Sequence, residues 1–196
     1  YLNNGGPSNV LINDVITDFP PFVQFYIAWE PAENTLLRNR GDGTFEGVTR
    51  GSGAEGLGIG SGVGAADLND DGFADLFVTE RTYYAMGKQV STQAGRTRLL
   101  VNRPNRNSWL KVALEGKRSP RTPFGARVTV VAGDLVQHQV LQSAHGYNST
   151  NDPVMIFGVG SRATVDRVEV RWPSGAVQVI EKPALRQTLR IVEARP

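Results

Sequence analysis

The sequence predicts an all-β protein, and three observations support this prediction. Glycine and proline are abundant, at 22 and 11 of the 196 residues. No long stretch repeats Leu, Ala, Glu and Lys at helical spacing. Several short runs in the second half alternate apolar and polar residues, as strands with one buried face do. Turn residues between short alternating runs favour many strands over helices.

The second half of the chain predicts a compact β-sandwich or barrel of about 90 residues. Turn residues separate its alternating runs at Gly133-Asp134 and at Pro173-Ser174-Gly175. We expect strands at 109–114, 126–131, 136–141, 165–172, 177–180 and 189–192.

A recurring motif in the first half of the chain predicts repeated β units. A short motif recurs as Leu2-Asn3, as Leu37-Arg38-Asn39 and as Leu100-Val101-Asn102. The last two copies are 63 residues apart, a period typical of repeats that hold several strands each. The first copy is closer to the second, so we expect one shortened unit and one full unit. The shortened unit has strand character over 10–18.

The segment from Asp67 to Asp75 predicts a calcium loop that joins two strands. Oxygen-bearing side chains occupy relative positions 1, 3, 5 and 9 around one glycine, Gly72. A helix-loop-helix calcium site would have Glu at relative position 12, where this chain has Val78 within an apolar run. The glycine-rich run 58–66 before the loop therefore predicts the first strand, and 75–79 the second. The expected ligands are Asp67, Asn69, Asp71, the Phe73 carbonyl and Asp75.

Two alternatives to a metal site remain open at this stage. An acidic turn that binds no metal has the same composition, because Asp, Asn and Gly favour turns. A second ion at Asn39, Asp42 and Gly43 is weighed against a plain turn, and the neutral balance of charges there favours the turn. Asp70 is expected to face solvent. All-oxygen ligands favour calcium over transition metals.

Composition excludes several other functions. The absence of cysteine excludes disulfides and thiol catalysis, and the apolar stretch 22–29 is too short to span a membrane. Many of the positive charges lie between Arg96 and Arg127, but few aromatic residues accompany them, so we expect solvated or paired arginines and no nucleic-acid site. The net charge is only +2.

A catalytic site is also weighed and set aside. Ser143, His145 and Asp152 invite comparison with a hydrolase, but no Gly-x-Ser-x-Gly motif surrounds the serine. Trp109 and Trp172 are candidates for stacking on a sugar, although aromatic residues in strands more often belong to the core. We therefore expect a protein that is not an enzyme.

The motifs resemble known families. The patterns at 39–45 and 67–75 resemble FG-GAP or VCBS repeats of β-propellers, and residues 107–193 resemble the ASPIC/UnbV domain. That second resemblance covers Trp109-Leu110-Lys111-Val112, Phe124-Gly125-Ala126-Arg127-Val128, Gly146-Tyr147, Asp152-Pro153, Phe157-Gly158-Val159-Gly160 and Val168 to Gly175. Together the two halves resemble the C-terminal portion of a CRTAC1-type protein, the family named after cartilage acidic protein.

The resemblance implies a domain division and a function. It implies partial propeller blades over 1–106 and an ASPIC/UnbV-like domain over 107–196. It also implies an extracellular or periplasmic, calcium-stabilised (Ca²⁺) module that binds other protein subunits, or an extracellular protein or glycan ligand, within a larger assembly. The alternative is an accessory binding region of an extracellular polysaccharide-active enzyme.

Overall fold

The computed structural model describes residues 7–11, 26–29, 32–55, 57–81, 84–85, 88–89, 97–146 and 149–195. Regular structure in these ranges consists of strands alone, which confirms the predicted all-β class. By their contacts, the residues form two compact units, one of residues 1–63 with 77–100 and one of residues 64–76 with 101–196. The loop from Asp67 to Asp75 therefore belongs to the same unit as the C-terminal strands.

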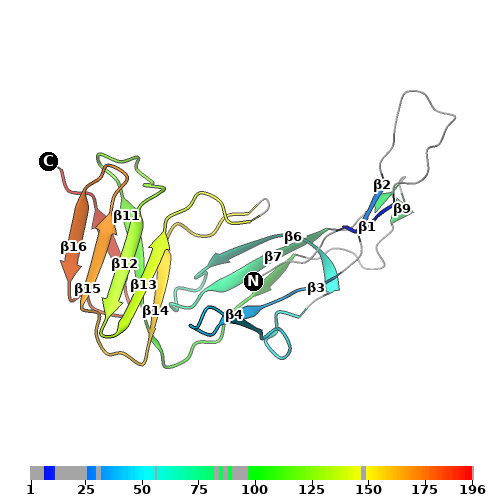
Figure 1. Ribbon diagram of the computed structural model, residues 1–196, viewed down its shortest axis with the longest axis horizontal. Coiled ribbons are helices and arrows are strands. Elements are labelled where there is room, and N and C mark those ends of the chain that lie inside the picture. The colour runs from blue at the N-terminus through cyan, green and yellow to red at the C-terminus, as the bar shows by residue number, and fades with distance from the viewer. Residues whose placement is uncertain are drawn as a thin grey trace. The chain divides into compact units, whose positions relative to one another are not determined.

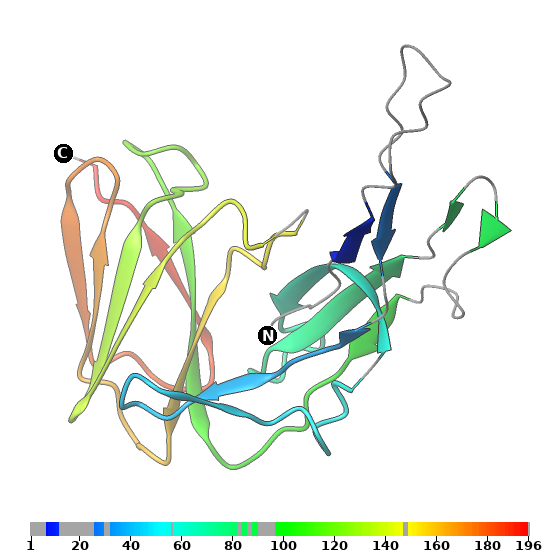
Figure 2. The ribbon, with the colours of Figure 1, turned by 45° about the vertical axis from the view of Figure 1, so that its right-hand side comes forward.

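The C-terminal unit is built on two sheets, seen in Figure 1 and from another side in Figure 2. One sheet has three strands in the order β14 (Met155–Gly160), β11 (Ser108–Glu115) and β17 (Thr188–Val192). The other sheet has four strands in the order β13 (Leu135–Val140), β12 (Arg127–Ala132), β15 (Arg167–Arg171) and β16 (Val177–Glu181). Every pairing in these sheets is antiparallel except that of β11 with β17.

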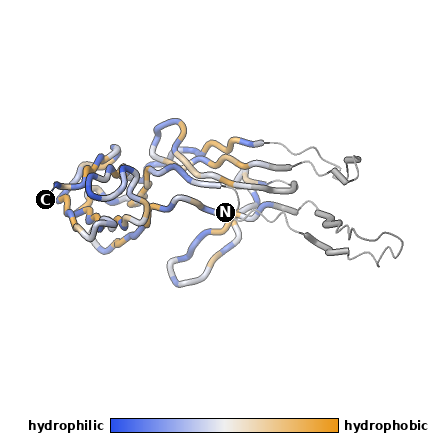
Figure 3. The backbone as a smooth tube through the Cα atoms, turned by 90° about the horizontal axis from the view of Figure 1, so that it is seen from above, coloured by the Kyte–Doolittle hydropathy of each residue, from blue (hydrophilic) through white to orange (hydrophobic). Residues whose placement is uncertain are grey.

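The alternating sequence accounts for these strands. Each predicted strand of the second half is present with its ends moved by a few residues, while β14 is a strand that the alternation did not indicate. Side chains of successive residues point to opposite faces of a strand, so β12 buries Val128 and Val130 and β15 buries Val168 and Val170, while Thr129 and Glu169 between them are partly exposed. Figure 3 shows hydrophobic and hydrophilic stretches alternating along this unit.

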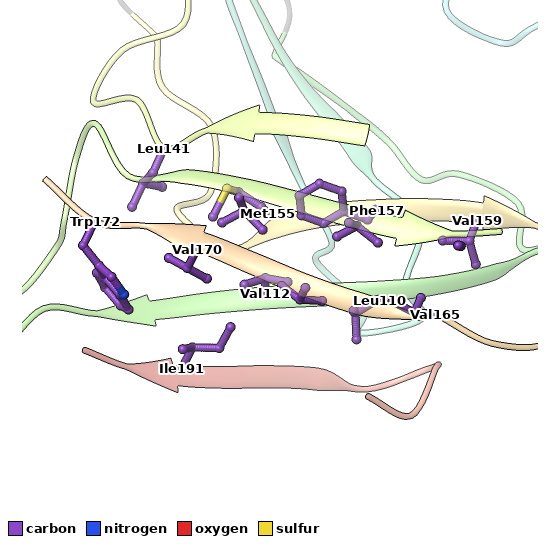
Figure 4. Close-up of a cluster of buried hydrophobic side chains, with 14 residues drawn as sticks. Leu110, Val112, Leu141, Met155, Phe157, Val159, Val165, Val170, Trp172 and Ile191 are labelled. Atoms are coloured by element: carbon purple, nitrogen blue, oxygen red, sulfur yellow. The ribbon is translucent and has the colours of Figure 1, made fainter. Parts of the chain in front are cut away.

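Apolar side chains from both sheets form one core. Figure 4 shows these side chains between the strands, with Ile191 on β17 and Trp172 at one end of the cluster. Trp172 is only 2% exposed, which places this tryptophan in the core and not on a sugar-binding surface. The core includes Leu110, Val112, Val128, Val130, Phe157, Val159, Val168 and Val170.

Two glutamine side chains link the sheets at one side. Gln137 and Gln139 on β13 donate their side-chain amides to the carbonyl oxygens of Gly158 and Ile156 on β14, at 2.9 and 2.7 Å. These bonds give β14 carbonyl groups partners that a neighbouring strand would otherwise supply. The predicted sandwich or barrel is therefore a sandwich whose sheets are joined by side chains along the β13 and β14 edges.

A buried carboxylate fastens the end of the chain to the rest of this unit. Glu193 follows β17, is 2% exposed, and accepts hydrogen bonds from the amides of Lys117, Arg118 and Ser119 at 2.9, 2.8 and 2.7 Å. Its other oxygen accepts the hydroxyl groups of Ser119 and Ser174 at 3.1 and 2.5 Å. Successive backbone amides of this kind form a nest for an anion. Glu193 thus joins the β11–β12 and β15–β16 connections to the last strand.

The other unit contains most of the first half. Its largest sheet has the order β10 (Arg98–Leu100), β7 (Asp75–Arg81), β6 (Leu57–Ala66) and β3 (Ala32–Glu33). Two-stranded ladders pair β1 (Pro7–Leu11) with β2 (Tyr26–Trp29), β4 (Leu37–Asn39) with β5 (Phe45–Gly47), and β8 (Tyr84–Ala85) with β9 (Lys88–Gln89). The strands predicted on either side of the loop from Asp67 to Asp75 are confirmed as β6 and β7. Of the predicted segment 10–18, the part beyond Leu11 lies outside the described residues.

The connection between β4 and β5 is a turn held by its own side chains. Asn39 Oδ1 accepts the Gly41 amide at 2.7 Å, and Asp42 Oδ1 accepts the amide and hydroxyl of Thr44 at 2.9 and 2.6 Å. The Thr44 bonds lower the pKa of the Asp42 carboxyl. Glycines 41 and 43 both have φ of +86°. The side-chain oxygens of Asn39 and Asp42 therefore bond the turn itself, in agreement with the preference for a turn over a second ion.

Candidate functional site

The loop from Asp67 to Asp75 turns the chain from the end of β6 to the start of β7. Gly72 has a φ of +88°, which favours glycine because a side chain there is strained. A Cβ atom at this position would also clash with the indole ring of Trp109. Two independent requirements therefore fix glycine at position 72, and Trp109 is a packing partner of the loop.

Asp67 organises the first half of the loop. Its Oδ1 accepts the amide of Asp71 at 3.0 Å, and its Oδ2 accepts the amide of Gly72 at 2.8 Å. The same Oδ2 is 2.7 Å from the ammonium nitrogen of Lys111 on β11, and the two side chains are only 3% and 6% exposed. The buried Asp67 carboxylate thus already forms an ion pair with a buried ammonium group.

Asp75 organises the second half. It is 1% exposed, its Oδ2 accepts the Leu68 amide at 2.9 Å, and its Oδ1 accepts the Asn102 amide at 2.8 Å. The side chain of Asn102 donates in return to the Ala74 carbonyl at 3.2 Å. Asn102 is the asparagine of the recurring motif at Leu100-Val101-Asn102. This motif therefore marks a residue that lies beyond the loop in sequence and bonds it.

The remaining expected ligands are bonded to one another. The side-chain amide of Asn69 lies 2.8 Å from Asp71 Oδ2, and Asp71 Oδ1 accepts the Phe73 amide at 2.9 Å. Asn69 Oδ1 also lies 3.3 Å from the Asp71 amide. The structure thus places Asp71 between Asn69 and the Phe73 backbone.

The loop offers the oxygen donors that calcium prefers, three carboxylates and an amide. In the part of the chain that the structure describes, however, no three acidic side chains lie close enough together to hold a metal ion. The reason is visible in the bonds above, since Asp67 and Asp75 face backbone amides and Asp67 also faces Lys111. The types of donor suit calcium, but the described arrangement does not gather the carboxylates around one ion, and a bound ion would have to share Asp67 with the Lys111 ammonium.

Lys111 is the functional residue that the sequence did not reveal. Its ammonium contacts Asp70 as well as Asp67 and lies 5.5 Å from the centre of the Trp109 ring. Asp70, at 85% exposed, faces solvent as predicted while making this contact. The sequence contains one indication of this role, a lysine between Leu110 and Val112 in an apolar strand. Its acidic partners could not be predicted, because they lie 41 and 44 residues away in sequence.

Burial and pairing act in opposite directions on this ion pair. Burial tends to raise the pKa of the Asp67 carboxyl, but the hydrogen bonds from Lys111 and Gly72 outweigh it, so the pKa lies below its ordinary value. Burial likewise tends to lower the pKa of Lys111, and the bonds to Asp67 and Asp70 raise it above its ordinary value. Both groups are therefore charged at neutral pH.

We expect Lys111→Met to destabilise the C-terminal unit by about 1–3 kcal/mol, because it leaves the buried Asp67 carboxylate without its cation. A surface pocket of about 270 Å³, lined by Asp67, Asp70 and Lys111, gives water access to the carboxylate and limits the loss. Urea unfolding at pH 7 measures the change.

The matched control is Lys117→Met. Lys117 pairs with Glu115 at 2.5 Å, but the two side chains are 38% and 44% exposed, and such pairs contribute about 1 kcal/mol or less. Equal losses for the two variants would contradict a special role for Lys111.

The candidate hydrolase residues do not form a catalytic relay. The Asp152 carboxylate accepts the amide of Val154 at 3.0 Å. The His145 backbone bonds Ser149 through both its amide and its carbonyl. Among the described residues, no hydrogen bond joins Ser143 to His145, whose Nδ1 is buried without a partner. These residues shape a connection between β13 and β14.

Comparison with known proteins finds one family-model match in each half of the chain. Residues 24–78 match the family model of the FG-GAP-like repeat, and residues 116–196 match that of the ASPIC and UnbV domain. The first match contains the candidate calcium loop, and the second contains most of the sandwich. No curated protein sequence matches the chain. No helix in the described ranges is long and apolar enough to cross a membrane.

Proposed function

Because the chain carries an FG-GAP-like repeat followed by an ASPIC and UnbV domain, the domain order of CRTAC1-type proteins, we propose that it is a calcium-stabilised extracytoplasmic module that binds protein or glycan partners. The two domains suggest an extracellular-type interaction module. We include in this proposal that the module binds calcium and a partner and that it catalyses no reaction.

The observation that carries the proposal is the placement of the loop. Asp67, Trp109 and Lys111 connect the repeat's acidic loop to β11 of the sandwich, through the ion pair and the contact over Gly72. An ion at the loop would act on the stability of the whole C-terminal unit and not on a solvated turn alone. We therefore propose a structural role for calcium, with Asp67, Asn69, Asp71, the Phe73 carbonyl and Asp75 as its ligands.

Sheet edges support the assembly part of the proposal. Among the strands that the structure describes, β10 and β3 are the outer strands of the four-stranded sheet in the first unit. Unpaired strand edges attract further strands, so proteins cover them with other chains or segments. We propose that this chain works within a larger assembly that covers those edges.

Calcium binding is tested on the 196-residue chain by thermal unfolding in millimolar calcium and in chelator. We expect calcium to raise the Tm of the wild type, because a ligand at about 100 times its Kd stabilises by about 2.7 kcal/mol. Asp71→Ala should lower the Tm in calcium to the value in chelator. Terbium luminescence excited through Trp109, which lies over the loop glycine, gives a second readout.

Asp70→Ala is the control. Asp70 is exposed and lies outside the proposed ligand set, so this variant should keep the calcium response. A wild-type Tm that is the same in calcium and chelator, together with no terbium signal, would overturn the calcium proposal.

A further inference from the structure

The outer face of the four-stranded sheet carries two arginines that lie directly opposite each other. Arg127 on β12 is the register partner of Arg171 on β15. Both side chains are exposed, and neither guanidinium forms an ion pair or hydrogen bond with any residue that the structure describes. Like charges directly across a sheet are destabilising. Folding alone therefore does not favour this arrangement.

Exposed valines flank the arginine pair on both sides. Val140 on β13 is the partner of Arg127, and Val177 on β16 is the partner of Arg171, so the row reads Val140, Arg127, Arg171, Val177 across the sheet. The valines are 46% and 47% exposed. Figure 1 shows the four strands in this order. The two valines therefore place apolar surface on either side of the arginine pair.

The next row limits how much negative charge a partner can bring. Glu169 lies two residues before Arg171 on the same face and is opposite Thr129 on β12. Thr129 in turn lies opposite His138, whose Nδ1 is 2.9 Å from the Thr129 hydroxyl. The third row pairs Arg167 with Glu181. Three arginines and two glutamates give the face a small positive charge. A shallow pocket of about 370 Å³ lies over Arg127, Arg171, Glu169 and their neighbours.

This chemistry selects one kind of partner. Two guanidinium groups present planar donors that match a carboxylate, and the valines on either side match apolar side chains. Glu169 in the next row would repel a second anion, which disfavours a polyanionic chain. None of the residues named in these three rows is Trp, Tyr or Phe, so the face lacks the large aromatic platform on which sugar rings stack.

We propose that this face docks a segment of a partner protein in which one acidic side chain lies between apolar ones. The carboxylate bonds Arg127 and Arg171, and the apolar neighbours contact Val140 and Val177. This inference rests on the proposed function as a binding module and gives that module a partner class and a surface.

The probe is a pair of synthetic peptides, acetyl-Leu-Val-Glu-Val-Leu-amide and the same peptide with Gln in place of Glu. Two-dimensional NMR of the labelled 196-residue chain should show shifts in β12, β13, β15 and β16 with the Glu peptide. We expect the Gln peptide to bind at least about tenfold more weakly, the effect of losing a charge-assisted hydrogen bond. Arg127→Gln and Arg171→Gln should each weaken binding of the Glu peptide to a similar extent.

Arg118→Gln is the matched control, because Arg118 is exposed in the β11–β12 connection and its change removes the same charge. If Arg118→Gln weakens binding of the Glu peptide as much as Arg171→Gln does, the proposal is overturned. The absence of shifts with the Glu peptide would also overturn it. Larger shifts on this face with a heparin hexasaccharide than with the peptide would also overturn it, in favour of a glycan.

The outcome can be separated from that of the calcium proposal. Arg171→Gln should leave the calcium-dependent Tm shift unchanged, and Asp71→Ala should leave the peptide shifts unchanged. Peptide binding without any calcium response would support the docking proposal and contradict the calcium proposal. A calcium response without peptide binding would support the calcium proposal and contradict the docking proposal.

Discussion

Gly72→Ala should destabilise the C-terminal unit by about 2–5 kcal/mol. Two costs add at this position. A side chain at a φ of +88° costs about 1–2 kcal/mol, and forcing its Cβ into the Trp109 ring costs about 1–3 kcal/mol more. Urea unfolding followed by circular dichroism measures the loss.

Gly175→Ala separates the two costs. Gly175 has nearly the same φ, +87°, but a Cβ atom there would have no heavy atom within 4 Å. This variant should lose only the conformational part, about 1–2 kcal/mol. If Gly72→Ala proves no more harmful than Gly175→Ala, Trp109 does not pack tightly on the loop.

A double variant provides a further check. Trp109→Leu replaces the whole indole ring with a smaller side chain, so adding Gly72→Ala to it should cost less than Gly72→Ala alone. Residues in direct contact give such non-additive energies, whereas distant residues do not. Additive losses would show that the loop and β11 are independent, and the loop would then not act on the stability of the sandwich.

The contrast between Gly72 and Trp109 illustrates what the sequence could predict. The acidic spacing and the apolar run after it correctly indicated a loop between two strands, because those signals are local. The indole over the glycine was not predictable, since it depends on how β11 packs. The calcium-like motif indicated one reason for glycine at position 72, the backbone angle of the turn, and the fold supplies the other, the Trp109 ring.

The same distinction explains what the sequence did not predict at the site. The spacing of the acidic residues indicated the loop, but it did not indicate that Lys111 and Asn102, 44 and 27 residues away, bond two of its carboxylates. Strands such as β15 and β16 were predictable from alternation because their pattern lies within five residues. Pairing partners, including the parallel neighbours β11 and β17, depend on the whole sheet.

Glu193 should make the stability of the C-terminal unit depend on pH in the acid range. Burial alone would raise the pKa of its carboxyl, but the bonds from Ser174 and the amides of Ser119, Lys117 and Arg118 outweigh it and lower the pKa from 4.5 to about 2. A pKa that is lower in the folded state stabilises the fold above the unfolded value. That stabilisation should be complete above about pH 5 and decline as the pH falls from there towards 2.

Glu193→Gln tests this dependence without changing the size of the side chain. We expect a lower Tm than the wild type at pH 7, and a difference between the two proteins that shrinks steadily as the pH falls from 5 to 2. Other acidic groups, including Asp67, titrate in both proteins and cancel in the difference. Glu181→Gln, an exposed change of the same kind, should show no such pH-dependent difference.

Glu193→Ala should have the larger effect, because it leaves three backbone amides and two hydroxyl groups without their acceptor. Buried donors without a partner are costly, and we expect the Tm to fall by roughly 10 °C or more. A difference between wild type and Glu193→Gln that stays constant from pH 7 to pH 2 would mean that the carboxylate is not the ionised anchor of the nest. The connections at Ser119 and Ser174 would then have to be held by neutral hydrogen bonds and packing alone.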